Sequence, residues 1–232
     1  MILSAKTLNI LKNYSSINPC IMVKAGSELT TISPNRDITS RAKVSDVFPK
    51  DFSIYSLSQF LQAITLLENP ELEFNDRYVN IYNQQTSLIY NYCEPELLKK
   101  AFKIPTFSNL EVSDSNSVQF KLLYKDIQDT LKAISIMNLT DMSFVGDGET
   151  IKLQAEKKED SNSGVKSGFY STIIGQTDKK FCAYFNPATI KMIATDYDVK
   201  ISLNNSLKVI YMNNPEIEYW IIMKDNSKLN LT

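Results

Sequence analysis

The sequence predicts an α+β protein built from two similar domains, and three observations support this fold class. Strand-like segments, in which apolar residues alternate or run together between turn signals, recur along most of the 232 residues. Short amphipathic helices separate blocks of these strands. The order of elements begins again near residue 118, which indicates an internal duplication. Because no sequence identity between the halves is visible, a generic α+β chain with coincidental symmetry is the alternative.

The first half opens with a helix at residues 4–15. Its apolar side chains, Leu8, Ile10, Leu11 and Tyr14, share one arc of the helical wheel. The opposite face carries cations and amides and no acid; its residues are Lys6, Asn9, Lys12 and Asn13. A second helix at 56–68 presents an uncharged polar face of Ser58, Gln62 and Thr65. Strands are predicted at 20–26, 28–33, 38–47, 71–74, 77–82 and 87–92.

Residues 94–117 show no clear period and form the predicted connector. At about 110 residues per domain, the chain is long enough for two domains. We therefore expect an N-terminal domain over residues 1–107 and a C-terminal domain over residues 108–232.

The second half repeats the order of elements. A strand at 118–123 leads into a helix at 124–137, with Ile127, Leu131 and Ile134 inward. The other side of this helix carries Lys125, Gln128, Lys132 and Ser135. A last helix is predicted from Asn186, its cap, and Pro187 to about Thr195, with Lys191 as its cation. Strands are predicted at 141–146, 150–157, 169–175, 181–185, 199–204, 207–212 and 217–224, and an exposed, mobile loop at 157–168.

The composition excludes several classes of function. The 25 Lys and Arg balance 26 Asp and Glu, so any attraction to a polyanion must be local. Histidine is absent, which removes His-based catalysis and His-ligated zinc. Cys20, Cys93 and Cys182 fit no metal or disulfide pattern and are expected to be free thiols. The acids lack calcium-loop spacing and the glycines form no nucleotide fingerprint, so we expect no metal and no cofactor.

No apolar run reaches the ~20 residues of a membrane span, and the segment MILSAKTLN has no signal-peptide pattern. We therefore expect a soluble, cytoplasmic protein without a membrane partner.

Four blocks of the chain are similar to the sliding clamps of T-even-type bacteriophages, which are DNA polymerase processivity factors. The blocks are LSAKTLNILKNYSSINPCIMVKAG, VSDVFPKDFSIYSLSQFLQAITLL, DIQDTLKAISIMNLTDMSF and FNPATIKMIATDYDVKIS. They follow one another in the family's order, and the chain length agrees. The connector and the loop at 157–168 diverge from the family.

The resemblance implies the DNA-clamp fold and a ring-forming homotrimer without enzymatic activity. Helices would line a central hole, and edge strands would join neighbouring subunits. The ring would hold duplex DNA without reading its sequence, through lysines that attract phosphates diffusely. The implied DNA-facing residues are Lys6, Asn9, Lys12, Asn13, Lys125, Gln128, Lys132 and Lys191.

The resemblance also implies partners in the cytoplasm of an infected bacterial host. An ATP-dependent clamp loader would open the ring, the replicative polymerase would dock through a C-terminal peptide, and late transcription factors are further candidates. The candidate docking residues are Ile104, Pro105, Phe107, Tyr219 and Trp220. For Trp220, a core position in a strand is the competing interpretation.

Two alternative functions stay open at this point. The first is a non-enzymatic phage protein that binds single-stranded nucleic acid or assists transcription, which aromatic platforms on a basic groove would favour. The second is an enzyme that uses carboxylates and magnesium.

Overall fold

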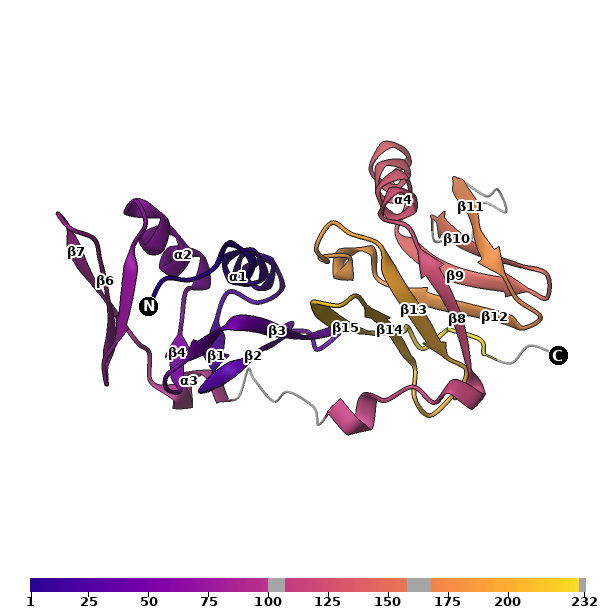
Figure 1. Cartoon of the computed structure of the whole chain (residues 1–232). Helices are drawn as coiled ribbons and strands as arrows, with labels where there is room; N and C mark the ends of the chain where they lie inside the picture. Colours follow the sequence, from indigo (N-terminus) through magenta and orange to yellow (C-terminus); the bar gives the residue numbers. More distant parts are fainter. Residues whose placement is uncertain (100–106, 158–167, 230–232) are drawn as a thin grey trace. The chain divides into compact units, whose positions relative to one another are not determined.

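The computed structural model describes residues 1–99, 107–157 and 168–229. The chain divides into two compact units, Met1–Ile104 and Pro105–Thr232, and each is described by itself. Figure 1 labels the helices and strands of both. The α+β class expected from the sequence is confirmed in each unit, because short helices accompany sheets in which the paired strands run antiparallel.

The first unit contains three α-helices and seven strands among its described residues. The helices are α1 (Ala5–Ile17), α2 (Leu57–Leu66) and α3 (Pro95–Lys99). The strands are β1 (Ile21–Val23), β2 (Gly26–Ile32), β3 (Ile38–Phe48), β4 (Phe52–Ile54), β5 (Glu71–Phe74), β6 (Tyr78–Tyr82) and β7 (Ser87–Asn91). β1 pairs with β4, β2 with β3, and β6 lies between β5 and β7.

The core of the first unit forms where α1 and α2 pack against each other and against the strands. The apolar stripe of α1 is buried at Ile10, Leu11 and Tyr14, and α2 buries its own stripe from Leu57 to Ile64. The Tyr14 hydroxyl donates to the Leu29 carbonyl oxygen at 3.1 Å, so this buried polar group is satisfied.

The second unit contains one α-helix and eight strands among its described residues. The helix is α4 (Tyr124–Met137), and short 3-10 helices lie at Phe107–Leu110 (η1), Asp114–Asn116 (η2) and Pro187–Thr189 (η3). The strands are β8 (Ser117–Leu122), β9 (Asp141–Asp147), β10 (Thr150–Glu156), β11 (Phe169–Gln176), β12 (Lys180–Phe185), β13 (Tyr197–Ser202), β14 (Val209–Asn213) and β15 (Ile217–Ile222). They form one sheet of order β11-β10-β9-β12 and a second run of order β8-β13-β14-β15.

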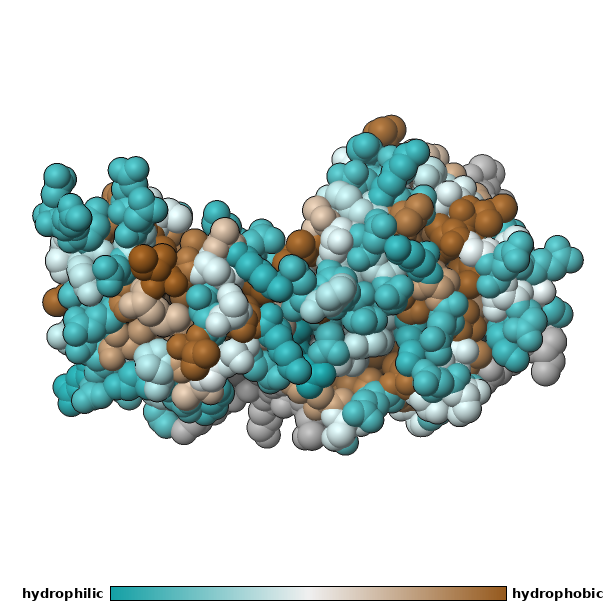
Figure 2. Space-filling model, in the orientation of Figure 1, coloured by the Kyte–Doolittle hydropathy of each residue, from teal (hydrophilic) through white to brown (hydrophobic). Residues whose placement is uncertain are grey.

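Helix α4 packs on β10 and β11 and ends in a left-handed residue. Asn138 adopts φ 52°, and its backbone N–H donates to the Ile134 carbonyl oxygen, which closes the last turn. The C-terminal end of the helix is apolar and open, since Ile136 is 80% exposed. Figure 2 shows a hydrophobic group at the top of the second unit, in the region of α4, next to hydrophilic residues.

One predicted helix is wrong in extent. The helix expected at 186–195 starts as predicted, because the Asn186 side chain accepts the Ala188 N–H and Pro187 occupies the first turn. It is only a 3-10 helix that ends at Thr189. The backbone of Ile193 bonds to the hydroxyls of Tyr197 on β13 and Tyr219 on β15 and therefore leaves the helical path.

Other differences concern short elements. The sequence predicted neither β4 nor α3, and the predicted connector contains α3, η1 and η2. Ile104 and Pro105, and most of the predicted loop at 157–168, lie outside the described residues.

Two strands differ from all other described strands because neither contains a buried residue. They are β7 and β11, each at an edge of its sheet. Each exposes an isoleucine: Ile89 is 61% exposed and Ile173 is 64% exposed. Unpaired strand edges with exposed apolar side chains invite pairing with another chain.

Candidate nucleic-acid interface

The polar face of α1 is exposed as the sequence predicted. Lys6, Asn9 and Lys12 are exposed, and Asn13 is half-buried. The apolar stripe on the opposite side of α1 lies in the core. Within the described residues, no ion pair is found for Lys12. This face therefore presents cationic and amide groups and no acid.

A carboxylate from a distant strand holds the start of α1. Asp46, on β3, accepts hydrogen bonds from the Ser4 backbone N–H at 3.0 Å and from the Ser4 hydroxyl at 2.8 Å. Partial burial alone would raise the pKa of Asp46, but hydrogen bonds from Thr7 and Ser4 outweigh it and lower that pKa. Ser4 is also the N-cap, because its Oγ accepts the Thr7 N–H at 3.2 Å. The lysine face of α1 is thus fixed to the sheet at its first turn.

The exposed face of α4 carries Lys125, Gln128 and Lys132, also as predicted. Ile127 is buried with Thr130 and Ala133, whereas Leu131 and Ile134 lie outside this buried set. Lys132 lies 3.5 Å from the Asp129 carboxylate, an exposed pair of the kind that contributes little to stability. This face is less basic than that of α1, because an acid accompanies one of its lysines.

A carboxylate also holds the start of α4. The Asp196 Oδ1 accepts the backbone N–H of Tyr124, the first residue of the helix, at 2.9 Å. Leu123, at the N-cap position, has no side chain that can cap the helix, so the Asp196 side chain takes over the role of the cap. The bond fastens the segment that carries Lys191, which is exposed, to the helix turn that carries Lys125.

The lysines of the sheets and turns differ from those of the helices. Many of them form ion pairs with aspartates, such as Lys24 with Asp51 at 2.6 Å and Lys152 with Asp147 at 2.8 Å. These charges are locally neutralised. Acidic partners for many sheet lysines, together with few acids on the helix faces, explain how a nearly neutral chain presents local positive surfaces.

The outer face of α2 is polar and uncharged. Ser58, Gln62 and Thr65 are exposed, as predicted, and the Thr65 hydroxyl donates back to the Leu61 carbonyl oxygen at 3.0 Å. The last residue of α2, Leu66, is 75% exposed. This face of α2 is thus uncharged, and its C-terminal end is apolar.

The candidate docking residues fall in different places. Trp220 is 4% exposed and packs under η1, where the Phe107 ring centroid lies 4.8 Å from its own. Leu110 and Val209 complete this apolar cluster. Tyr219 points to the other side of β15 and is fully buried, so a partner cannot reach it in this conformation. The position of Trp220 agrees with the competing interpretation, in which it is a packed aromatic residue of a strand.

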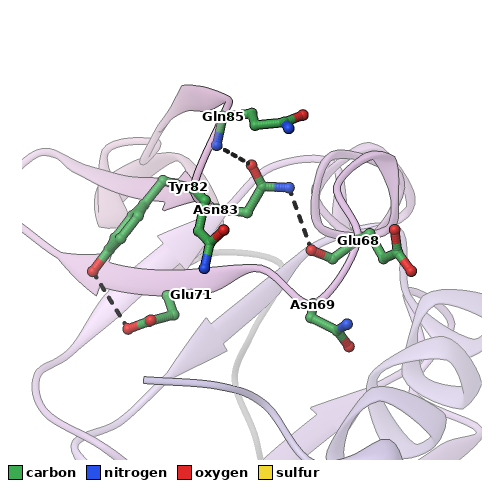
Figure 3. Close-up of a pocket in the computed structure, with 7 residues that line it drawn as sticks. Glu68, Asn69, Glu71, Tyr82, Asn83 and Gln85 are labelled. Carbon is green, nitrogen blue, oxygen red and sulfur yellow. Dashed lines mark hydrogen bonds between the residues drawn. The ribbon is translucent and has the colours of Figure 1, made fainter.

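A polar pocket lies in the first unit where α2 leads into β5, beside the turn between β6 and β7 (Figure 3). Its volume is about 480 Å³, and Glu68, Glu71 and Tyr82 contribute to the lining. The Asn83 side chain donates to the Glu68 carbonyl oxygen at 3.3 Å and accepts the Gln85 N–H at 3.0 Å. One bond lies within the turn between β6 and β7, and the other ties this turn to the segment that follows α2.

The three cysteines are free, and burial raises the pKa of each thiol. No group of three or more His, Cys, Asp or Glu side chains could hold a metal ion within the described ranges. The longest described helix has 14 residues, and no helix in the described part of the chain could cross a bilayer.

The aromatic residues of the two lysine-bearing helices do not form a platform for bases. Tyr14 is buried in the core of the first unit, and Tyr124 is half-buried at the start of α4. This arrangement lacks the stacking surface that single-strand binding proteins use.

Comparison with known proteins shows similarity to processivity factors. The family described as DNA polymerase processivity factor matches residues 4–96. The sliding clamp of Vibrio phage KVP40 is 26% identical over 202 residues, which cover 87% of this chain and 90% of that protein. The sliding clamp of Enterobacteria phage T4 is 27% identical over 207 residues, 85% of each chain.

Solved structures show the same fold at low sequence identity. A putative DNA polymerase III beta subunit from Eubacterium rectale has a TM-score of 0.66 at 12% identity, with 97% of this chain covered. The chain spans 65% of the length of that bacterial protein. PCNA from Thermococcus kodakaraensis has a TM-score of 0.63 at 11% identity, and the match covers 97% of this chain and 99% of PCNA.

These matches define the fold as the DNA-clamp fold, as the sequence led us to expect. The phage relatives support the resemblance seen in the sequence: the chain is similar to the sliding clamps of T4-like phages, and residues 4–96 match the family described as DNA polymerase processivity factor.

Proposed function

We propose that three copies of this chain close head to tail into a ring around duplex DNA and tether the replicative polymerase of a phage. In the ring, each unit is one clamp domain, and α1, α2, α4 and the Lys191 segment face the DNA. The clamp performs no chemistry itself and acts in the cytoplasm of the infected bacterium. An ATP-dependent clamp loader opens it, and phage late transcription factors are further partners.

The observation that carries this proposal is the pair of edge strands without buried residues. Ile89 on β7 and Ile173 on β11 are about equally exposed, one in each unit. A head-to-tail contact between β7 of one copy and β11 of the next uses two different surfaces and closes into a ring when the rotation permits. Closure also removes both exposed edges.

Apolar helix ends extend both surfaces. In the first unit, α2 contacts β7 and exposes Leu66 at its end. In the second unit, Met137 lies close to Gly168, the residue before β11, and Ile136 is exposed next to it in sequence. Each edge strand is thus accompanied by an apolar helix end, and burying both pairs would stabilise the joint at roughly 25 cal/mol per Å².

The lysines of the helix faces would line the central hole of the ring, called the bore below, and attract DNA there. Lys6, Lys12, Lys125, Lys132 and Lys191 supply compact, flexible charges that attract phosphates without bidentate base contacts. A clamp that holds DNA loosely can slide along it, since sequence-independent electrostatic binding permits sliding. The face of α2 carries no charge and adds no electrostatic attraction to the DNA.

Solution mass tests the ring. At micromolar concentration, light scattering should give a mass near three times 26.4 kDa. Ile89→Lys and Ile173→Lys should each shift the protein to a monomer, because a lysine in the apolar joint would be desolvated without a partner. Ile2→Lys is the matched control, since Ile2 is 62% exposed and lies away from both strands in sequence. A monomeric wild type that binds single strands tightly would contradict the proposal.

A further inference from the structure

Two buried tyrosines hold the backbone of one residue in the segment that follows η3. The Tyr197 hydroxyl donates to the Ile193 carbonyl oxygen at 2.7 Å. The Ile193 backbone N–H donates to the Tyr219 hydroxyl oxygen at 3.3 Å. Both polar groups of the Ile193 backbone are therefore satisfied by side chains of β13 and β15.

The two tyrosines are rigid supports. Tyr197 is 1% exposed and Tyr219 is 0% exposed, and their rings meet edge to face with centroids 5.9 Å apart. Burial raises the pKa of both hydroxyls, so they stay protonated at neutral pH. The two hydroxyls also hydrogen-bond to each other. Moving the segment would break the bonds that its Ile193 N–H and C=O make with them, and these bonds therefore oppose movement.

The segment that these bonds fix carries a predicted DNA-facing cation. Lys191 lies two residues before Ile193 and is exposed. Three residues after Ile193, Asp196 accepts the Tyr124 N–H of α4. The Lys191 N–H itself donates locally to the Thr189 carbonyl oxygen at 2.8 Å. The backbone after Lys191 is thus held by the two tyrosines at Ile193 and by the start of α4 at Asp196.

We propose that Tyr197 and Tyr219 are positioning residues for Lys191, which hold its backbone so that the ammonium group reaches a phosphate of the encircled duplex. The inference rests on the proposed function of the clamp. A cation on a fixed backbone loses less conformational entropy on contact than one on a loose segment. Without the tyrosine hydroxyls, Lys191 keeps its charge, but its backbone is no longer held in a fixed position.

Variants that remove only the hydroxyls test the proposal. Tyr197→Phe and Tyr219→Phe keep both rings in the core. Tyr211→Phe is the matched control, because its hydroxyl donates to Glu218 at 2.6 Å on β15 of the same sheet, and Tyr211 lies outside the 190–196 segment in sequence. Lys191→Gln removes the charge, and Lys191→Gln combined with Tyr219→Phe tests whether the two residues act together.

The first measurement is hydrogen exchange on the assembled protein. In Tyr219→Phe, the Ile193 amide should exchange about tenfold faster, since a net hydrogen bond contributes on that order. Tyr211→Phe should leave this amide unchanged. Unchanged exchange at Ile193 in both phenylalanine variants of the pair would overturn the proposal.

The second measurement is association with a short labelled duplex at several NaCl concentrations. Lys191→Gln should lower the slope of log affinity against log salt by about 0.9 for each phosphate that is no longer neutralised. Tyr219→Phe should lower the slope in the wild-type background and leave it unchanged in the Lys191→Gln background. An equal reduction in both backgrounds would show a general structural role and reject the assignment. If the wild-type trimer did not bind the duplex at all, the proposed function itself would fail.

Discussion

The Asp196 carboxylate of the second unit accepts the backbone N–H of Tyr124 at 2.9 Å, across 72 positions of the sequence. It is the counterpart of Asp46, which accepts the Ser4 N–H at the start of α1. In each unit, the helix that carries the lysine face begins on a carboxylate from elsewhere in the fold. A negative charge at this place also interacts favourably with the positive end of the helix dipole.

Replacing Asp196 should therefore loosen the start of α4. Asp196→Ala should lower the free energy of unfolding by about 1 kcal/mol, the usual effect of losing a helix cap. Asp198→Ala, on the exposed side of β13, is the control and should change little. Urea unfolding followed by circular dichroism measures both. Equal stability of the two variants would show that the Asp196 bond does not contribute.

The Asp46 carboxylate should make stability depend on pH at the acid end. Hydrogen bonds lower its pKa in the folded state, so its contribution is complete above the unfolded value of about 3.9 and is lost as pH falls through the lower folded value. Asp46→Asn should thus be less stable than the wild type near neutral pH, and the difference should shrink on acidification. Unfolding at a series of pH values checks this, and a constant difference would argue against the titration of Asp46.

Charge reversal on the two lysine helices should impair function without disrupting assembly. Lys12→Glu with Lys132→Glu should weaken clamp loading and processive synthesis, because each reversal turns attraction to a phosphate into repulsion. The trimer should persist, since Lys12 is exposed and Lys132 is largely so. Lys180→Glu, on β12, is the control for charge alone. If processivity stayed at the wild-type level, the assignment of the bore would be wrong.

Trp220 offers a direct report on docking, because it is the only tryptophan in the chain. If the polymerase C-terminal peptide binds where Phe107 covers Trp220, titration of that peptide should change the tryptophan emission. Phe107→Ala should alter the emission before any peptide is added, since the two rings are in contact. A peptide that binds, by calorimetry, without changing the emission would place the docking site elsewhere.

Periodic patterns predicted the long elements of this fold well. The stripe of Ile10, Leu11 and Tyr14 and that of α4 are long enough to distinguish a helix from a strand, and both helices formed. β4 has only three residues and α3 only five, so neither is long enough to show a repeating pattern. The helix expected at 186–195 failed because tertiary hydrogen bonds outweigh local propensity at Ile193.

The candidate site could be predicted only in part. Helical periodicity indicated that Lys12, Lys125 and Lys132 would lie on the outer faces of their helices, and they do; that they face DNA stays a prediction. The supporting contacts of Asp46 and Asp196 were missed, since their partners lie 42 and 72 positions away. Tyr219 was a candidate docking residue under the resemblance, yet the structure places it in the core.

The length of β7 has a consequence for how long the proposed clamp stays closed. With five residues, β7 can form only a short ladder with a neighbouring copy, so each joint rests on few hydrogen bonds and a small apolar contact. Such a ring would come apart on dilution and reassemble at higher concentration. On circular DNA without a polymerase, its residence time would be set by the opening of a single joint, and a bound polymerase would lengthen it.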